Sequence, residues 1–137
     1  MTEVKDMLVL IHDQLIADET IAKLTKAVNG NYRIKLYEYP EKADHTQAFI
    51  IIEPVGPPRT SNSGSNEDLQ LEFTVQISCE SPIRTEVKQL QHAIKKVMQQ
   101  LNYGQLTDGL DVYFADTGHF VDARRFQGST ALYDTNY

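Results

Sequence analysis

The side chains best suited to bind a metal ion in this chain lie near its C-terminal end, at Asp116, His119 and Asp122. Carboxylate oxygens and an imidazole nitrogen can bind a divalent cation when the three side chains converge. A small metal-assisted enzyme is therefore one hypothesis. The same stretch is also typical of a polar hairpin turn, with Asp116 and Gly118 supplying the turn conformations. The turn is the favoured interpretation, because neither an HExxH motif nor a CxxC pair supports a zinc site.

Other reactive side chains lie in patterns that indicate structure rather than catalysis. Cys79, the only cysteine, continues the apolar side of an alternating stretch that begins at Leu71, so we predict a small core residue and not a nucleophile. Paired carboxylates could also do acid–base chemistry, but 19 acidic residues make chance pairings common. The sequence therefore predicts no catalytic residue, no cofactor and no metal ligand, and we expect a protein that is not an enzyme.

Length and composition predict a single domain that spans residues 1–137. A hydrophobic fraction of 41% and a charged fraction of 23% are typical of a globular chain. The net charge of −6 argues against nucleic acid as the main ligand, because phosphate binding relies on clustered lysine and arginine. No apolar run approaches the roughly 20 residues needed to cross a bilayer, so no membrane partner is expected.

The elements that must position these residues begin with helices. Apolar residues recur every three or four positions from Val4 to Leu15 and indicate a first helix, with Thr2 as its N-cap. Asp18–Glu19 marks the start of a short second helix. Ser81–Pro82 predicts an N-cap followed by proline at the first helical position, and this helix should run to about Asn102.

Strands are predicted where the apolar residues alternate with polar ones. The clearest is Leu71 to Cys79, whose alternation indicates one buried and one wet face. Phe49 to Glu53 is apolar on both faces, as a central strand would be. Further strands are expected at residues 32–39, 110–115 and 120–127. The fold class is therefore α+β, with two main helices on one face of a mainly antiparallel sheet of four to five strands, in the order α-(α)-β-β-β-α-β-β.

A long polar insert at residues 54–68 separates two of these strands. Hairpin connections usually need about two to five residues, and a longer structureless loop in a small domain is normally functional or disordered. The insert is rich in proline, glycine, serine and asparagine and offers almost nothing to bury. We therefore predict a flexible β-β loop that becomes ordered against a partner.

Aromatic and basic residues on the strands suggest contacts between subunits. Tyr37 and Tyr113 carry amphipathic rings that suit a protein interface, and they could equally cover sheet edges. Arg124 and Arg125 could pair with the acidic residues of a neighbouring subunit, or could form a solvated edge that discourages aggregation. These four residues are the candidates for inter-subunit contact.

Three stretches of sequence, together with the order of elements over nearly the whole chain, carry a family resemblance. They are the polar insert before the strand at residues 67–77, the helix start at residues 81–84 (SPIR) and the ending at residues 116–128 (DTGHFVDARRFQG). In these features the chain resembles the tail-completion proteins of long-tailed bacteriophages. That group includes tail terminators, tail-to-head joining proteins and siphovirus minor tail proteins.

The resemblance implies a structural virion protein that needs no cofactor. Family members form a ring, expected to be homohexameric, at the head-proximal end of the tail, where they end tail-tube polymerisation or join the tail to the head. The implied partners are further copies of the chain, the tail tube protein, and the connector or stopper proteins of the neck. DNA would only pass through the lumen of the ring. An acidic chain would not bind the DNA, because the two carry charge of the same sign. The expected location is the virion, after assembly in the cytoplasm of the bacterial host.

By position, the resemblance also assigns contacts with the tail tube and neck to the polar insert. The residues concerned are Pro57, Pro58, Arg59, Thr60, Ser61, Asn62, Ser63, Ser65 and Asn66. An alternative to the ring protein is a small soluble adaptor that binds a peptide along a strand edge near Arg33 to Tyr39. The other alternative is the metal-assisted enzyme that would use Asp116, His119 and Asp122.

Overall fold

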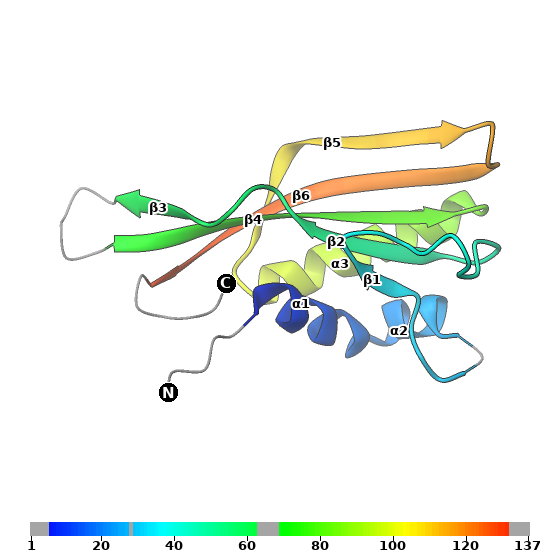
Figure 1. Cartoon of the computed structure of the whole chain (residues 1–137), viewed down its shortest axis with the longest axis horizontal. Helices are drawn as coiled ribbons and strands as arrows, with labels where there is room; N and C mark the ends of the chain where they lie inside the picture. The colour runs from blue at the N-terminus through cyan, green and yellow to red at the C-terminus, as the bar shows by residue number, and fades with distance from the viewer. Residues whose placement is uncertain (1–5, 28, 63–68, 132–137) are drawn as a thin grey trace.

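The computed structural model of the chain describes residues 6–27, 29–62 and 69–131. Figure 1 shows an α+β arrangement with the helices below a long twisted sheet. The predicted class and order of elements are confirmed, with one further strand, β3. The elements are α1 (Met7–Ile16), α2 (Glu19–Thr25), β1 (Ile34–Leu36), β2 (Phe49–Pro54), β3 (Arg59–Asn62), β4 (Leu69–Ser81), α3 (Arg84–Gln100), β5 (Gly104–Phe114) and β6 (His119–Ala131).

All the described strands belong to one mixed sheet. Its main path runs β1-β2-β4-β6-β5, and β3 pairs with β4 beside that path. β1 lies parallel to β2, whereas the other pairs are antiparallel. β4, the strand with the clearest alternation in the sequence, is central. Along one edge it pairs first with β3 and then with β2, and along the other it pairs with β6.

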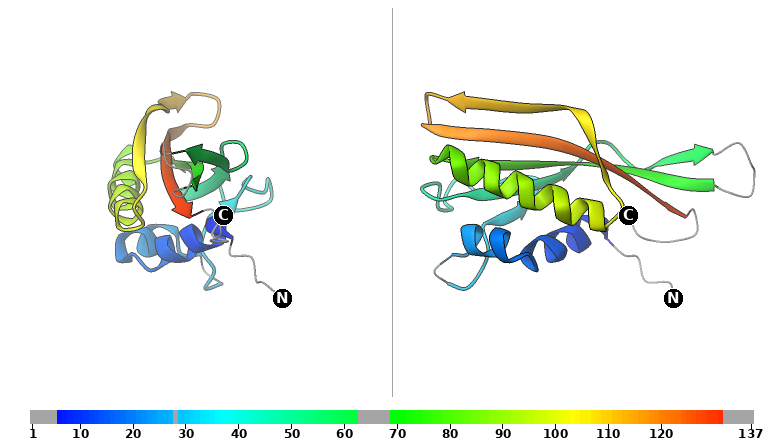
Figure 2. Two further views of the ribbon diagram at one scale, coloured as in Figure 1. Left: turned by 90° about the vertical axis from the view of Figure 1, so that its left-hand side faces the viewer. Right: turned by 180° about the vertical axis from the view of Figure 1, so that it is seen from behind.

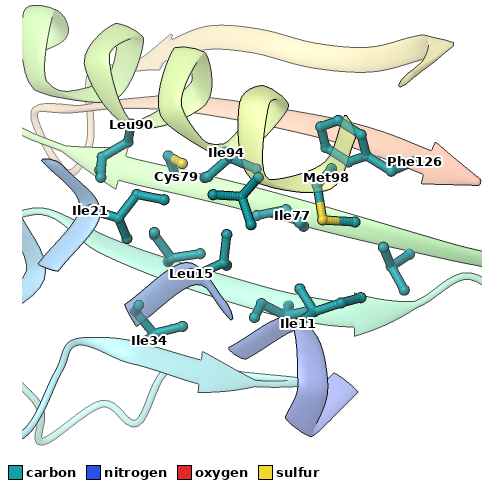
Figure 3. Packing of buried hydrophobic residues seen from close by; sticks show 14 of the residues in the cluster. Ile11, Leu15, Ile21, Ile34, Ile77, Cys79, Leu90, Ile94, Met98 and Phe126 are labelled. Carbon is teal, nitrogen blue, oxygen red and sulfur yellow. The ribbon is translucent and has the colours of Figure 1, made fainter. Parts of the chain in front are cut away.

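The core lies between the sheet and the three helices, which all cover the same face (Figures 1 and 2). Ile77 and Cys79 of β4 are fully buried on this face, beneath Leu90 and Ile94 of α3 (Figure 3). The apolar residues of α3 recur at helical spacing from Val87 to Met98, so they form one stripe along the helix, and this stripe faces the sheet. Burying each large aliphatic side chain contributes about 1.5–3 kcal/mol. No helix among the described residues covers the opposite face of the sheet, and we call it the open face.

Two helices begin later than the sequence patterns predicted. The N-cap of α1 is Asp6, whose carboxylate accepts the Leu8 backbone N–H at 2.9 Å; the predicted cap Thr2 lies outside the described residues. The N-cap of α3 is Ile83 rather than Ser81. The Ser81 hydroxyl instead accepts the Ile83 backbone N–H at 3.0 Å and donates to Glu86 at 2.7 Å. Ser81 therefore stabilises the turn that leads into the helix.

β1 is much shorter than the predicted strand at residues 32–39. It covers only Ile34–Leu36, because Tyr37 adopts a left-handed backbone conformation with φ 71°. Few residues with a side chain take this conformation, and it turns the chain out of the sheet. In contrast, the final hairpin is confirmed, and both of its strands, β5 and β6, are longer than predicted.

The polar insert was predicted to be structureless throughout, and this is wrong at its centre. Arg59–Asn62 form β3, in register with residues 69–72 of β4. A sequence without apolar alternation can still be a strand at this position, because β3 needs only backbone hydrogen bonds to β4. Residues 63–68 lie outside the described residues. β3, the start of β4 and the end of β6 form an arm that extends past the helices (Figure 1).

Among the described residues, no helix has the length and apolar character required to span a membrane.

Candidate functional site

The predicted metal-binding residues do not converge. Asp116 lies in the exposed turn between β5 and β6, whereas His119 and Asp122 are both in β6. Two strand residues three positions apart point to opposite faces of the sheet. Asp122 accordingly contacts Lys88 of α3, while His119 contacts Glu80 of β4. Within the described ranges, no group of three potential ligands is placed to hold a metal ion.

Asp122 belongs to an ion-pair network that ties α3 to the last two strands. Its carboxylate is only 2% exposed and lies 2.8 Å from the Lys88 ammonium and 3.0 Å from the Arg124 guanidinium. Lys88 also pairs with Asp111 of β5. Partial burial lowers the pKa of Lys88, but the hydrogen bonds and charges of the two aspartates outweigh it and raise the pKa above its ordinary value. The network is structural in character, since every charge in it is matched.

Gln91 completes the same network from α3. Its side chain is fully buried, and the amide nitrogen donates to the backbone carbonyls of Ile77 and Asp122 at 3.2 and 2.6 Å. This links α3 to β4 and β6 at the point where the buried aspartate sits. Cys79 is buried nearby, and burial raises the pKa of its thiol well above the ordinary value. A thiolate nucleophile at neutral pH is therefore disfavoured at this position.

A row of hydrogen bonds crosses the open face of the sheet from β2 to β5. The Gln76 amide donates to Glu53 at 3.2 Å, and Arg125 donates to the Gln76 side-chain carbonyl at 3.1 Å. Arg125 also pairs with Asp108 at 3.0 Å. Arg124 and Arg125 thus point to opposite faces, and each guanidinium is paired within its own chain. Their proposed role in contacts between subunits remains a prediction, now with a competing intramolecular partner for each.

An aromatic cluster anchors the loop that follows β1 to the open face. The Tyr39 ring stacks on Phe49 of β2 with centroids 3.8 Å apart, and His45 meets both rings edge-on. The His119 ring also meets Phe49 edge-on, with centroids 6.4 Å apart, and its Nδ1 is 2.6 Å from the Glu80 carboxylate. The Tyr39 hydroxyl donates to the Asp44 carbonyl at 2.6 Å. These contacts give the loop a fixed shape.

The predicted interface tyrosines are both on the surface. Tyr37 is 62% exposed and Tyr113 is 55% exposed. Tyr113 belongs to β5, the edge strand at the end of the main path, and Leu110 and Phe114 of the same strand are also exposed. Scattered exposed apolar residues are common, but three on one unpaired edge are typical of a contact surface.

The described part of the polar insert lies close to Tyr37. Pro57 and Pro58 line a groove of about 390 Å³ together with Tyr37 and Phe73. Arg59 of β3 has an exposed guanidinium that lies 3.5 Å from the Glu72 carboxylate. Thr60, Ser61 and Asn62 complete β3, whereas Ser63, Ser65 and Asn66 lie outside the described residues.

The peptide-binding edge of the adaptor hypothesis is only partly present. β1 does lie at the edge of the sheet. However, Arg33 is buried, and its guanidinium donates to the backbone carbonyls of Ala48, Lys26 and Leu24 at 2.8–2.9 Å. Arg33 therefore ties α2 to the sheet with a buried guanidinium and does not present it at the strand edge.

A basic groove between α2 and α3 was missed by the sequence-based interpretation. Lys23, His92 and Lys96 line a groove of about 430 Å³ whose floor includes Leu24 and Ala93. His92 lies on the exposed side of α3. Only the packing of α2 beside α3 brings the three residues together, so the spacing within either helix gives no signal for the groove.

No family model matches the chain, and no curated protein matches it. Among solved structures, the fold is similar to a chain of the virion of a native gene transfer agent particle, with a TM-score of 0.61. The match covers 88% of this chain and 91% of that chain, at 13% sequence identity. The likeness at this identity defines the fold class: an α+β domain shared with a component of a virion particle.

Proposed function

We propose that the chain is a structural virion protein that forms a ring at the head-proximal end of a phage tail. There it ends polymerisation of the tail tube, joins the tail to the head connector, or both. The observation that carries the proposal is the match in fold, over most of both chains, to a component of a gene transfer agent virion. The resemblance to tail-completion proteins, which rests on three stretches of sequence and on the order of elements, supports the same class.

The surface of the chain supports assembly rather than catalysis. The described ion pairs around Asp122 are matched, and the clefts on the surface are lined by mixed side chains without a converging catalytic set. In contrast, β5 offers an unpaired edge with exposed apolar residues, and the arm of β3 and β4 extends from the body. An extended arm and an open sheet edge are features through which copies of one protein can contact one another.

Light scattering coupled to size-exclusion chromatography, across a concentration series, tests the ring. The expected result is a species near six times the 15.6-kDa chain, with rings in negative-stain images. A chain that assembles only on its template would instead bind to purified tail tubes and cap one end. A chain that remains monomeric and does not bind tail tubes would overturn the proposal.

The role of the segment that leads into the arm is tested by replacing Pro57 and Pro58 with serine. Both residues lie before β3, so the fold should be retained while capping of tail tubes is weakened. Asp116→Ser is the matched control, because Asp116 is an exposed turn residue at the opposite end of the sheet (Figure 1). Equal capping by all three proteins would remove this segment from the proposed contact with the tail.

A further inference from the structure

Exposed basic residues outnumber the one exposed acidic residue, Glu19, on the outward side of α2 and α3, although the whole chain carries a net charge of −6. Lys23 of α2 and Arg84, Lys95 and Lys96 of α3 are exposed. Within the described part of the chain, none of these four side chains forms an ion pair with a carboxylate, in contrast to Lys88 of the same helix, which pairs with two. We call these four residues, with the neighbouring His92, the basic helix face.

The basic helix face is hollowed where the two helices meet. The groove between α2 and α3 has a volume of about 430 Å³, and Lys23, His92 and Lys96 stand around it. Asp18 also lines the groove, but its carboxylate already accepts the Ile21 backbone N–H at 3.1 Å as the N-cap of α2. Counting Asp18 against Lys23 and Lys96, the groove keeps a formal net charge of +1, which suits an acidic segment.

An acidic segment of suitable size lies elsewhere on the same chain. The loop at residues 37–47, here called the acidic loop, carries Glu38, Glu41 and Asp44 against the single cation Lys42. All four side chains are exposed. Three negative charges and one positive charge leave the loop with a formal net charge of −2, opposite in sign to the basic helix face.

The acidic loop is already shaped before it meets a partner. Tyr39 stacks on Phe49, and the Asp44 carboxylate accepts the Thr46 backbone N–H at 2.8 Å. Tyr37, at the start of the loop, is held at φ 71° although its side chain is 62% exposed. Backbone strain at an exposed bulky residue is a common mark of a functional surface. A preformed loop also loses little conformational entropy on binding.

The two surfaces lie on opposite sides of the molecule. Figure 2, in its end-on view, places α3 on one side of the sheet and the loop between β1 and β2 on the other. A copy therefore cannot bring its own loop to its own groove. Two different, complementary patches on opposite sides of one chain are what a head-to-tail contact requires, and such contacts close into rings when the rotation allows.

We propose that the acidic loop of one copy docks into the groove between α2 and α3 of the next copy, and that this contact closes the ring. The proposal rests on the proposed function, because it names the contact through which that ring forms. Glu38 and Glu41 of the loop face Lys23 and Lys96 of the neighbouring groove. Tyr37 supplies an apolar contact at the edge of the same interface.

Charge reversal on each surface tests the contact. In the groove variant, Lys23→Glu and Lys96→Glu place acidic residues opposite an acidic loop; in the loop variant, Glu38→Lys and Glu41→Lys place basic residues opposite a basic groove. Each variant alone should raise the dissociation constant for assembly by about tenfold or more, because like charges meet at the interface. All four residues are exposed, so the fold should survive, and circular dichroism checks this.

Mixing the two variants gives the decisive result. In an equimolar mixture, the basic loop of the loop variant meets the acidic groove of the groove variant at every second contact, and an acidic loop meets a basic groove at the contacts between them. Alternating rings with an even number of subunits should therefore form again. A single chain carrying all four substitutions should also assemble by itself. Lys26→Glu is the matched control for Lys96→Glu, because it changes the charge equally at an exposed position outside the groove.

The outcomes separate this contact from the function on which it rests. Rings that form equally well in every variant would overturn the docking contact and leave the ring protein standing. A wild-type chain that forms no ring and caps no tail tube would overturn both. If the groove variant assembles normally but loses binding to a fluorescent DNA duplex that the wild type binds, the groove is a nucleic-acid surface and the proposal fails.

Discussion

His119 and Asp122 of β6 are separated by two residues, and this spacing places them in different surroundings. Side chains along a strand alternate between the faces of the sheet, so an interval of three reverses the direction. Asp122 binds Lys88 of α3 on the helix-covered face, whereas His119 contacts Glu80 and Phe49 on the open face. In a helix or a tight turn the same spacing could bring the side chains together, which explains why it looked like a ligand set.

The buried carboxylate of Asp122 should contribute strongly to stability. Replacing it with asparagine leaves Lys88 and Arg124 without their shared counter-ion, at a site where Asp122 is 2% exposed and each partner is 29% exposed. Removing one partner of a buried pair costs about 3–5 kcal/mol, and partial exposure of the cations reduces this to about 2 kcal/mol. Urea unfolding followed by circular dichroism measures the loss.

Asp111→Asn is the control for that measurement. Asp111 contacts the same lysine, but its side chain is 63% exposed, so its loss should cost less than about 1 kcal/mol. Equal effects of the two substitutions would contradict the importance of burial in this network.

Because the aspartates raise the pKa of Lys88, the stability that the lysine contributes is present below pH 10.5 and is lost as the pH rises above that value.

Tyr103 should make the chain less stable at alkaline pH. Burial raises the pKa of its phenol from 10.0 to about 12. Between these values the folded chain keeps a proton that the unfolded chain releases, so the free energy of unfolding falls as the pH rises from 10 towards 12. Tyr103→Phe should flatten this fall while keeping the ring packed against Gly128. Urea titrations at pH 8 and pH 11 compare the two proteins; an unchanged slope in the variant would rule out Tyr103 as its source.

At the scale of elements, the most regular patterns were the most reliable predictors. The alternation from Leu71 to Cys79 lies within β4, and the apolar stripe between Val87 and Met98 lies within the buried face of α3. Both elements have enough periodic positions for local sequence to determine the structure. Their exact starts were less predictable, because Ser81 caps a turn that precedes α3 rather than the helix itself.

Elements that depend on distant partners could not be predicted in this way. β3 exists because residues 59–62 meet the start of β4, and β1 is parallel to β2 across a loop that folds back on the sheet. The candidate surfaces share this property. The groove between α2 and α3 combines residues such as Lys23 and Lys96 that only the packed helices bring together. Local spacing carries no information about such pairs.

The loop that leaves β1 offers a test at the same scale. Tyr37→Gly should stabilise the fold by about 1 kcal/mol, because glycine adopts φ near 71° without steric cost and the exposed ring of Tyr37 contributes little to the core. The same substitution should weaken assembly, since it removes the apolar contact proposed beside the acidic loop. Thermal unfolding and size-exclusion chromatography measure the two effects.

Asn102→Gly is the comparison for this substitution. Asn102 also has a positive φ, of 64°, but asparagine tolerates this conformation, so the gain in stability should be smaller. Asn102 follows α3 and lies outside the acidic loop, so assembly should be unaffected. A loss of stability in Tyr37→Gly would show that the tyrosine ring, and not its backbone strain, dominates at this position.

At the scale of the whole molecule, the distribution of charge matters more than its sum. A net charge of −6 predicts mutual repulsion between copies. The basic helix face and the acidic loop lie on opposite sides, so copies that approach in one orientation attract each other despite this repulsion (Figure 2). Such an arrangement favours one head-to-tail orientation over all others, which is the requirement for a closed ring rather than a disordered aggregate.

The ionic strength of the solution should therefore control assembly. The distance over which charges act falls from about 30 Å at 0.01 M salt to about 3 Å at 1 M. If the acidic loop and the basic helix face hold neighbouring copies together, the assembled fraction at fixed protein concentration should decrease steadily over this range, as sedimentation velocity can show. In the Lys23→Glu, Lys96→Glu variant the assembled fraction should instead rise with salt, because salt then screens a repulsion. Association that strengthens with salt in the wild type would instead favour an apolar contact through Leu110 and Phe114 on the edge of β5.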